Sequence, residues 1–177
     1  QALTWVRDRF DWLEPESPNL GALLEIGRQL VLRRGVRGLV LDPWNEIEHS
    51  RARDVTETEY IGECLRRIRV FARSHQVHVF VVAHPQKLVK GEDGQYPVAG
   101  PYEISGSANW HNKPDVVLSV WRERGPHVTH TDVQVHVQKM RHKYAGQLGV
   151  TTLKWNRTNG QYRDPDEAMR YQNKGAA

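Results

Sequence analysis

Apolar residues near the start of the chain recur every three or four positions, which predicts an amphipathic helix. Those within 20–31 fall on one stripe, as the buried side of a surface helix requires. Ser17 followed by Pro18 is a favourable beginning, because a serine side chain caps free backbone N–H groups and proline suits the first turn. We therefore expect a helix over 18–34 that Gly35 ends.

A second helix is expected between two short apolar runs. Thr56 and Glu59 form a capping box ahead of apolar residues spaced three and four apart, and the pattern continues to about Ser74. The runs at 36–42 and 77–83 are short and centred on consecutive apolar residues, which is typical of strands buried on both faces. Because strands and helices alternate, the predicted fold class is α/β, with a mostly parallel sheet and helices on both faces.

The sequence changes character after the second apolar run. Residues 86–101 are rich in glycine, proline and charge, which predicts a long, mobile loop of the kind that is usually functional. A short helix around 102–111 and a strand at 116–121 are expected next. The alternating segments 132–138 and 149–155 predict an antiparallel hairpin near the end of the chain.

Composition limits the number of domains, the class of partner and the compartment, but it does not identify a function. With 177 residues we expect one domain, and a net charge of +4 from 25 basic and 21 acidic residues permits a partner with phosphates. The single cysteine, Cys64, excludes an intramolecular disulfide and fits a reducing compartment. No apolar run approaches the roughly 20 residues of a membrane helix. A cytoplasmic protein with no membrane contact is expected.

Two polar residues stand where the apolar strands end. Asp42 closes the first run and His84 the second, and ligands of parallel sheets bind at the carboxyl ends of the strands. An aspartate there can hold Mg²⁺, usually through water, and a histidine there can contact a γ-phosphate. The residues alone leave two simpler interpretations open: Asp42 caps a loop, and His84 is an ordinary solvated histidine.

Basic and small residues beyond the second strand could meet phosphates. Backbone amides of residues 105–107 and nearby lysines suit a nucleic-acid strand, although a plain turn with scattered lysines fits equally well. Lys139 and Arg141 lie two residues apart, so on an extended strand they reach one anionic target unless they are simply solvated. The candidate DNA-contacting residues are Lys87, Lys90, Ser105, Gly106, Ser107, Asn109 and Lys113.

Taken in order, four segments resemble the RecA-like motor domain of DnaB-type hexameric replicative helicases. The likeness is greatest to phage and prophage primase-helicases and their Twinkle-like relatives, and it covers 18–163. LVLDPWNE is similar to the family's Walker B strand, and VVAHPQK to its third motif. YEISGSANWHNKPDVVLSVWR is similar to the DNA-proximal fourth motif, and VQKMRHKYAGQLGVTTLKWN to the closing hairpin.

The resemblance implies a RecA-like three-layer fold over residues 1–163, followed by a polar tail at 164–177. It implies that Asp42 organises Mg²⁺ through water, that His84 senses the γ-phosphate of ATP, and that Arg141, assisted by Lys139, is an arginine finger acting in the neighbouring subunit. The loops after Asn45 and Lys87 would hold single-stranded DNA in a central channel.

The resemblance also implies an activity, its cofactors, a partner domain and a cellular location. The activity would be ATP-dependent 5′-to-3′ DNA unwinding by a hexameric ring, with ATP and Mg²⁺ as cofactors. A primase or toprim-like domain would lie upstream, and the setting would be the cytoplasm of a bacterial or phage-infected cell.

The sequence departs from the family pattern at the phosphate-binding loop. No GxxxxGK[ST] occurs in the 177 residues, so we expect the chain alone to hydrolyse ATP negligibly. Either the chain is the later part of a motor domain, as its start at Gln1 favours, or it is a non-hydrolysing module that binds single-stranded DNA or a partner. A third hypothesis assigns a metallohydrolase site to four residues: Asp42, His49, His84 and Asp115.

Overall fold

The computed structural model describes residues 2–16, 18–104, 108–125 and 128–165, and the chain divides into two units. Unit 1 contains residues 1–56 and 66–84, and unit 2 contains residues 57–65 and 85–177. The long helix α3 (Glu57–His75) contributes to both, because the division falls within it. Each unit is considered by itself.

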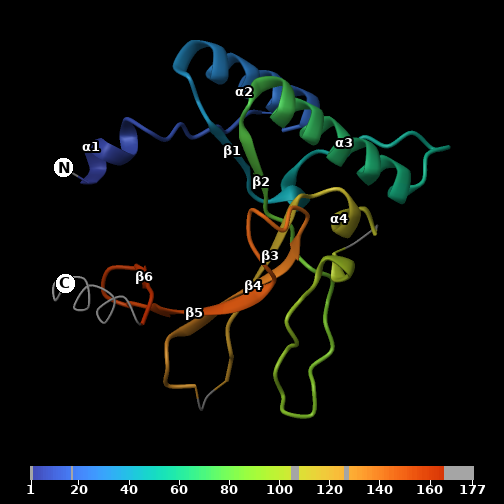
Figure 1. Cartoon of the computed structure of the whole chain (residues 1–177). Helices are drawn as coiled ribbons and strands as arrows, with labels where there is room; N and C mark the ends of the chain where they lie inside the picture. Colours follow the sequence, from blue (N-terminus) through green and yellow to red (C-terminus); the bar gives the residue numbers. More distant parts are fainter. Residues whose placement is uncertain (1, 17, 105–107, 126–127, 166–177) are drawn as a thin grey trace. The chain divides into compact units, whose positions relative to one another are not determined.

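Unit 1 contains two parallel strands and the helices that precede and connect them (Figure 1). After the short helix α1 (Ala2–Arg7), the elements are α2 (Leu20–Arg34), β1 (Gly38–Leu41), the 3₁₀ turn η1 (Trp44–Glu46), the second half of α3, and β2 (His78–Val81). The strands pair in parallel from Gly38 opposite His78 to Leu41 opposite Val81. This confirms the predicted parallel arrangement, although both strands are shorter than the apolar runs.

Helix α2 begins later than the sequence predicted. Its N-cap is Asn19, whose side chain accepts a hydrogen bond from the backbone N–H of Ala22. The prediction that Pro18 is the first helical residue is therefore wrong, and Ser17, the predicted N-cap, lies outside the described residues. The predicted end is confirmed, because Gly35 adopts the left-handed conformation at φ 66° that favours glycine.

The core of unit 1 forms where α2 and α3 cover one face of the strands. Gly27 of α2 faces Phe71 of α3 and Leu39 of β1 so closely that an added Cβ would lie 3.2 Å from the Phe71 ring. Leu39 and Leu41 point into this core, whereas Val40 and Phe80 on the opposite face are 58% and 51% exposed. Within the described residues, helices therefore pack on one face of this two-stranded sheet.

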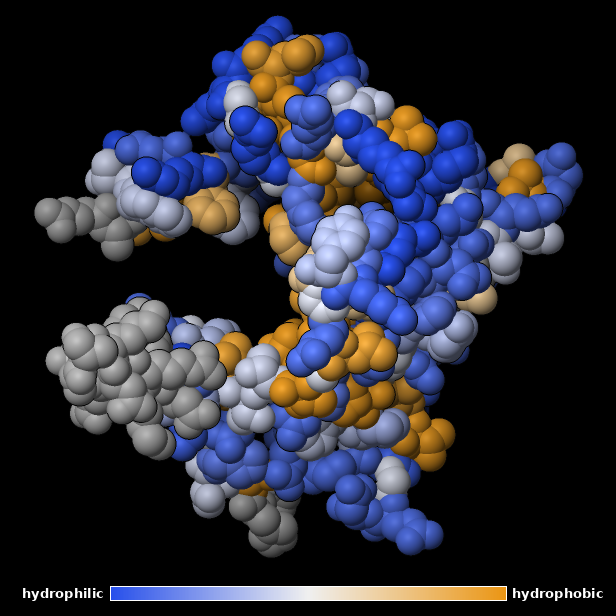
Figure 2. All heavy atoms as spheres, viewed as in Figure 1, coloured by the Kyte–Doolittle hydropathy of each residue, from blue (hydrophilic) through white to orange (hydrophobic). Residues whose placement is uncertain are grey.

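Unit 2 is built on an antiparallel sheet of four strands in the order β3-β4-β5-β6. These are β3 (Val116–Trp121), β4 (Asp132–Met140), β5 (Gly149–Trp155) and β6 (Tyr162–Arg163). The predicted hairpin is confirmed as β4 and β5, and the strand β6 was not predicted. Leu118 and Val120 of β3 are exposed, at 53% and 73%. Figure 2 shows apolar side chains at the surface in the region where Figure 1 draws this sheet.

The segment between β2 and β3 differs from its prediction in two ways. In place of a helix over 102–111 there are a 3₁₀ turn, η2 (Pro101–Glu103), and a single helical turn, α4 (Asn109–Asn112). The preceding loop was predicted to be mobile, and Figure 1 draws it as a long excursion. Three hydrogen bonds join its returning arm to β3 and the residues after it: Trp121 to Tyr96 O (2.7 Å), Ser119 to Ala99 O (2.5 Å) and Arg124 N to Gln95 (3.0 Å).

Among the helices of the described ranges, none is long and apolar enough to span a membrane. The α/β class with parallel strands and a C-terminal antiparallel hairpin is confirmed. The predicted polar tail at 164–177 lies outside the described residues from 166 onward.

Candidate functional site

Asp42 and His84 lie at the same end of the parallel strand pair. Asp42 follows the last residue of β1, and His84 stands three residues after the end of β2. Beyond the paired strands, the backbone N–H of Val82 donates to Leu41 O (2.9 Å) and that of Trp44 to Val82 O (2.7 Å). The predicted common rim is therefore present in unit 1.

A side chain that the sequence did not single out connects the two strand ends. The backbone N–H of His84 donates to Asn45 Oδ1 over 3.1 Å. Asn45 belongs to the turn η1 that begins two residues after Asp42, so this bond fixes the loop after β2 against the loop after β1. The only sequence signal was the position of Asn45 in the same polar cluster as Asp42.

Asp42 offers carboxylate oxygens that no neighbour occupies. The residue is exposed, and within the described residues its side chain makes no hydrogen bond or ion pair. Carboxylate oxygen is the ligand type that Mg²⁺ prefers, and Mg²⁺ usually retains several waters. One exposed acid at this rim fits a water-mediated Mg²⁺ ion.

Trp44 and Ile47 have structural positions in the loop after β1. They are 6% and 7% exposed, and the backbone N–H of Glu48 donates to Pro18 O, which joins this loop to the start of α2. The Trp44 ring lies 4.7 Å from that of His49, whose Nε2 contacts Trp44 O at 3.1 Å. The apolar side chains of this predicted DNA loop are therefore core residues, and its acids are exposed.

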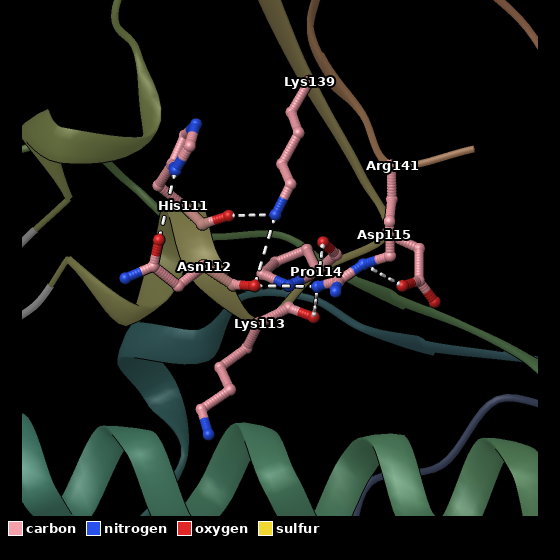
Figure 3. Close-up of polar contacts among 7 residues, drawn as sticks. All are labelled: His111, Asn112, Lys113, Pro114, Asp115, Lys139 and Arg141. Atoms are coloured by element: carbon pink, nitrogen blue, oxygen red, sulfur yellow. Dashed lines mark hydrogen bonds and ion pairs between the residues drawn. The ribbon is translucent and has the colours of Figure 1, made fainter. Parts of the chain in front are cut away.

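Lys139 and Arg141 converge on the backbone at the C-terminal end of α4, as Figure 3 shows. Lys139 Nζ donates to the carbonyl oxygens of His111 and Asn112, the latter at 3.2 Å. Arg141 Nη2 donates to Asn112 O at 2.7 Å and more weakly to the next two carbonyl oxygens. The two cations thus share a target within the same chain, but it is a group of neutral carbonyls, so their contact with an anionic group stays a prediction.

Arg141 also forms an ion pair that the sequence did not predict. Its Nε lies 2.6 Å from Asp115 Oδ1, with the two side chains 31% and 48% exposed. Asp115 had been considered only as a metal ligand. The described residues contain no group of three or more His, Cys, Asp or Glu side chains that could hold a metal ion, so the metallohydrolase hypothesis has no support there.

The candidate DNA-contacting residues have varied surroundings. Lys87 is exposed, and Lys90 Nζ lies 5.2 Å from the centre of the Tyr96 ring. Asn109 Nδ2 donates to Thr58 O at 3.0 Å, which gives Asn109 a structural role between α4 and α3. Lys113 is half-buried. Ser105, Gly106 and Ser107 lie outside the described residues.

Comparison with known proteins adds an independent line of information. No family model matches the chain. The Twinkle homolog protein, chloroplastic/mitochondrial, of Arabidopsis thaliana is 41% identical over 164 residues, which covers 90% of this chain. The chain spans 23% of the length of that relative.

Two solved structures share the fold. A structure described as an ATPase domain matches 82% of this chain and 51% of its own, with a TM-score of 0.67 and 18% identity. A DnaB-like replicative helicase, described with its interactions with primase, matches 85% of this chain and 37% of its own, with a TM-score of 0.68 and 17% identity. This chain has the RecA-like fold of DnaB-type helicase domains and is similar in sequence to a Twinkle homolog.

Proposed function

We propose that this DnaB-type domain is part of an ATP-dependent replicative DNA helicase in which hydrolysis at subunit interfaces drives movement along single-stranded DNA. The observation that carries the proposal is the rim of unit 1, where an exposed carboxylate and a histidine stand together at the ends of parallel strands. This is where open α/β sheets bind ligands. The 41% identity to a Twinkle homolog supports the same conclusion.

In this proposal the two strand-end residues have separate roles. Asp42 holds Mg²⁺ through water, and His84 contacts the γ-phosphate of ATP and transmits its presence to the loop at 86–100. The bond from His84 N to Asn45 Oδ1 also couples the histidine backbone to the loop after Asp42. When bound, Mg²⁺ would neutralise negative charge on the phosphate oxygens.

Arg141 acts in a neighbouring subunit as an arginine finger, and Lys139 assists it. A guanidinium suits a phosphoryl group in transfer because its planar donors match the oxygen geometry and it stays charged. Both cations lie at the end of β4. Self-association into a ring is required for this arrangement, and we propose a hexamer with 5′-to-3′ movement.

Single-stranded DNA would contact the loops after Asn45 and Lys87, together with Lys90, Lys113 and the segment 105–109. Cations along such a path grip the backbone without regard to sequence. A primase or toprim-like partner domain is proposed on the likeness to a helicase described with primase. The compartment is also a proposal: we predicted a bacterial or phage-infected cytoplasm, whereas the Twinkle homolog is described as chloroplastic and mitochondrial.

DNA-stimulated ATP hydrolysis by the natural full-length protein tests the proposal. Asp42→Asn and Arg141→Ala should each lower turnover, and loss of an arginine finger is worth about 10³–10⁵ in kcat. Glu123→Gln and Arg124→Ala are matched controls from the loop after β3 and should leave turnover unchanged. Wild-type turnover in either site variant would contradict the assignment.

The alternative is a module that holds single-stranded DNA without hydrolysis, through stacking and phosphate contacts that need no nucleotide. The two functions are separated by measuring DNA binding and ATP hydrolysis on the same full-length preparation. DNA binding with no nucleotide turnover would favour the module. Turnover that DNA stimulates would favour the helicase.

A further inference from the structure

The guanidinium of Arg141 is held on two of its three nitrogens (Figure 3). Nε faces Asp115 Oδ1 at 2.6 Å, and Nη2 donates to three successive carbonyl oxygens at 2.7, 3.1 and 3.3 Å. Within the described residues Nη1 makes no hydrogen bond. Because the group is planar and rigid, fixing two nitrogens also fixes the direction of the third.

The backbone reinforces this arrangement. Asp115 immediately precedes β3 and Arg141 immediately follows β4, and the two strands pair from Val116 opposite Met140. The N–H of Arg141 donates to Asp115 O at 2.8 Å, which extends the strand pairing by one residue. Asp115 therefore contacts Arg141 through both its main chain and its side chain.

The ion pair between Asp115 and Arg141 is expected to contribute little to folding stability. Both side chains are partly exposed, at 31% and 48%, and ion pairs near solvent add little to the free energy of unfolding. What the carboxylate does supply is orientation, because a flexible arginine otherwise samples many rotamers. A guanidinium that must meet a phosphoryl group benefits directly from being held in one orientation.

We propose that Asp115 is a positioning residue for Arg141: it fixes the guanidinium so that Nη1 remains the donor available to a phosphoryl oxygen of a nucleotide in the neighbouring subunit. The proposal rests on the proposed role of Arg141. The carbonyl oxygens of residues 112–114 fix Nη2 of the guanidinium, and Lys139 donates to the adjacent carbonyl oxygens of His111 and Asn112.

The first experiment measures how strongly Asp115 restrains the Arg141 guanidinium, without reference to activity. Full-length protein is treated with phenylglyoxal in the absence of nucleotide, and the modification rate of each arginine is followed by peptide mass spectrometry. Asp115→Ala should raise the rate at Arg141 several-fold, and Asp115→Glu should raise it less. Arg28, which is paired with Glu25 in unit 1, is the internal control. An unchanged rate at Arg141 would overturn the proposal.

The second experiment measures the effect of this restraint on ATP hydrolysis. Asp115→Ala should lower kcat for DNA-stimulated ATP hydrolysis by about 10²-fold, the size expected when a reacting group is misplaced by about 1 Å, with KM nearly unchanged. In an Arg141→Ala background the same change should cause no further loss. Glu123→Gln, a partly exposed acid paired with His130, should leave kcat unchanged.

The outcomes separate this inference from the function on which it rests. Additive losses in the double variant would show that Asp115 acts on something other than Arg141, and would overturn the positioning role while the helicase assignment stands. Full turnover in Arg141→Ala would overturn the proposed finger and the positioning role together. In that case the labelling experiment would still report whether Asp115 holds the guanidinium.

Discussion

The side chain of Asn45 and the backbone of His84 are joined by a hydrogen bond of 3.1 Å. This bond links the loop that carries Asp42 to the loop that follows β2. The two strands pair in parallel only as far as Leu41 and Val81, so a side chain extends the connection beyond the sheet. The proposed metal-binding and phosphate-sensing residues thus share one local scaffold.

Asn45→Ala should separate these two loops with little loss of stability. The bond is exposed, so its removal should cost no more than about 1.5 kcal/mol in urea unfolding. ATP turnover by the full-length protein should fall by roughly tenfold, because His84 is no longer aligned with Asp42. Asn45→Asp retains the acceptor oxygen and is the control for the tether. Equal turnover in Asn45→Ala and wild type would show that the bond has no part in the site.

Trp44→Ala should destabilise unit 1 rather than act chiefly on DNA binding. Trp44 is 6% exposed, and truncating a buried aromatic residue to alanine typically costs about 3–5 kcal/mol. Urea unfolding of the chain measures this cost. Trp12→Ala is the matched control, because Trp12 is 86% exposed. If Trp44→Ala weakened DNA binding with unchanged stability, Trp44 would belong to the DNA surface instead.

Gly27→Val tests how closely α2 packs on the core. A Cβ at this position would lie 3.2 Å from Phe71 and 3.3 Å from Leu39, so the larger side chain must displace one of them. Overpacking of this kind costs about 1–3 kcal/mol. Gly149→Val is the control, since nothing lies within 4 Å of a Cβ there and valine favours a strand. A thermal melt that is the same for Gly27→Val and wild type would contradict the packing described.

Much of this fold could be predicted from periodicity, and specific elements show why. The α3 pattern is long and regular, so its span was predicted closely, and the αL glycine at 35 correctly marked the end of α2. Proline and serine at 17–18 gave a stronger local signal than Asn19, yet Asn19 is the cap. The choice follows from tertiary contact, because Pro18 O accepts a hydrogen bond from Glu48 in the loop after β1.

The candidate site was predictable only in part. Asp42 and His84 could be placed on one rim, since parallel strands end at the same edge. Asn45 and Asp115 could not be assigned their contacts, because each depends on a partner at least 26 positions away in the chain, at His84 and Arg141. The loop at 86–101 was predicted to be mobile from its composition, and the hydrogen bonds from β3 that hold it leave no local signal in its own sequence.

Neutralising Lys87 and Lys113 should weaken binding of single-stranded DNA and reduce its dependence on salt. Each phosphate contact that is removed should lower the slope of log K against log salt by about 0.7. Fluorescence anisotropy with labelled oligothymidine at several salt concentrations measures the slope for Lys87→Gln and Lys113→Gln. The control is Lys154→Gln on β5, which is exposed and outside the proposed path. A slope that matches wild type in both variants would remove these lysines from the DNA surface.

The central claim is that Asp42 of one subunit and Arg141 of its neighbour complete one nucleotide site, and mixed rings test it most directly. Full-length Asp42→Asn and Arg141→Ala proteins are each prepared, mixed under conditions that exchange subunits, and assayed for ATP hydrolysis. Mixed rings contain interfaces where an intact Asp42 meets an intact Arg141, so the mixture should hydrolyse ATP faster than either variant alone. If the mixture shows only the average of the two variants after subunit exchange, the two residues do not act across a shared interface and the account is wrong.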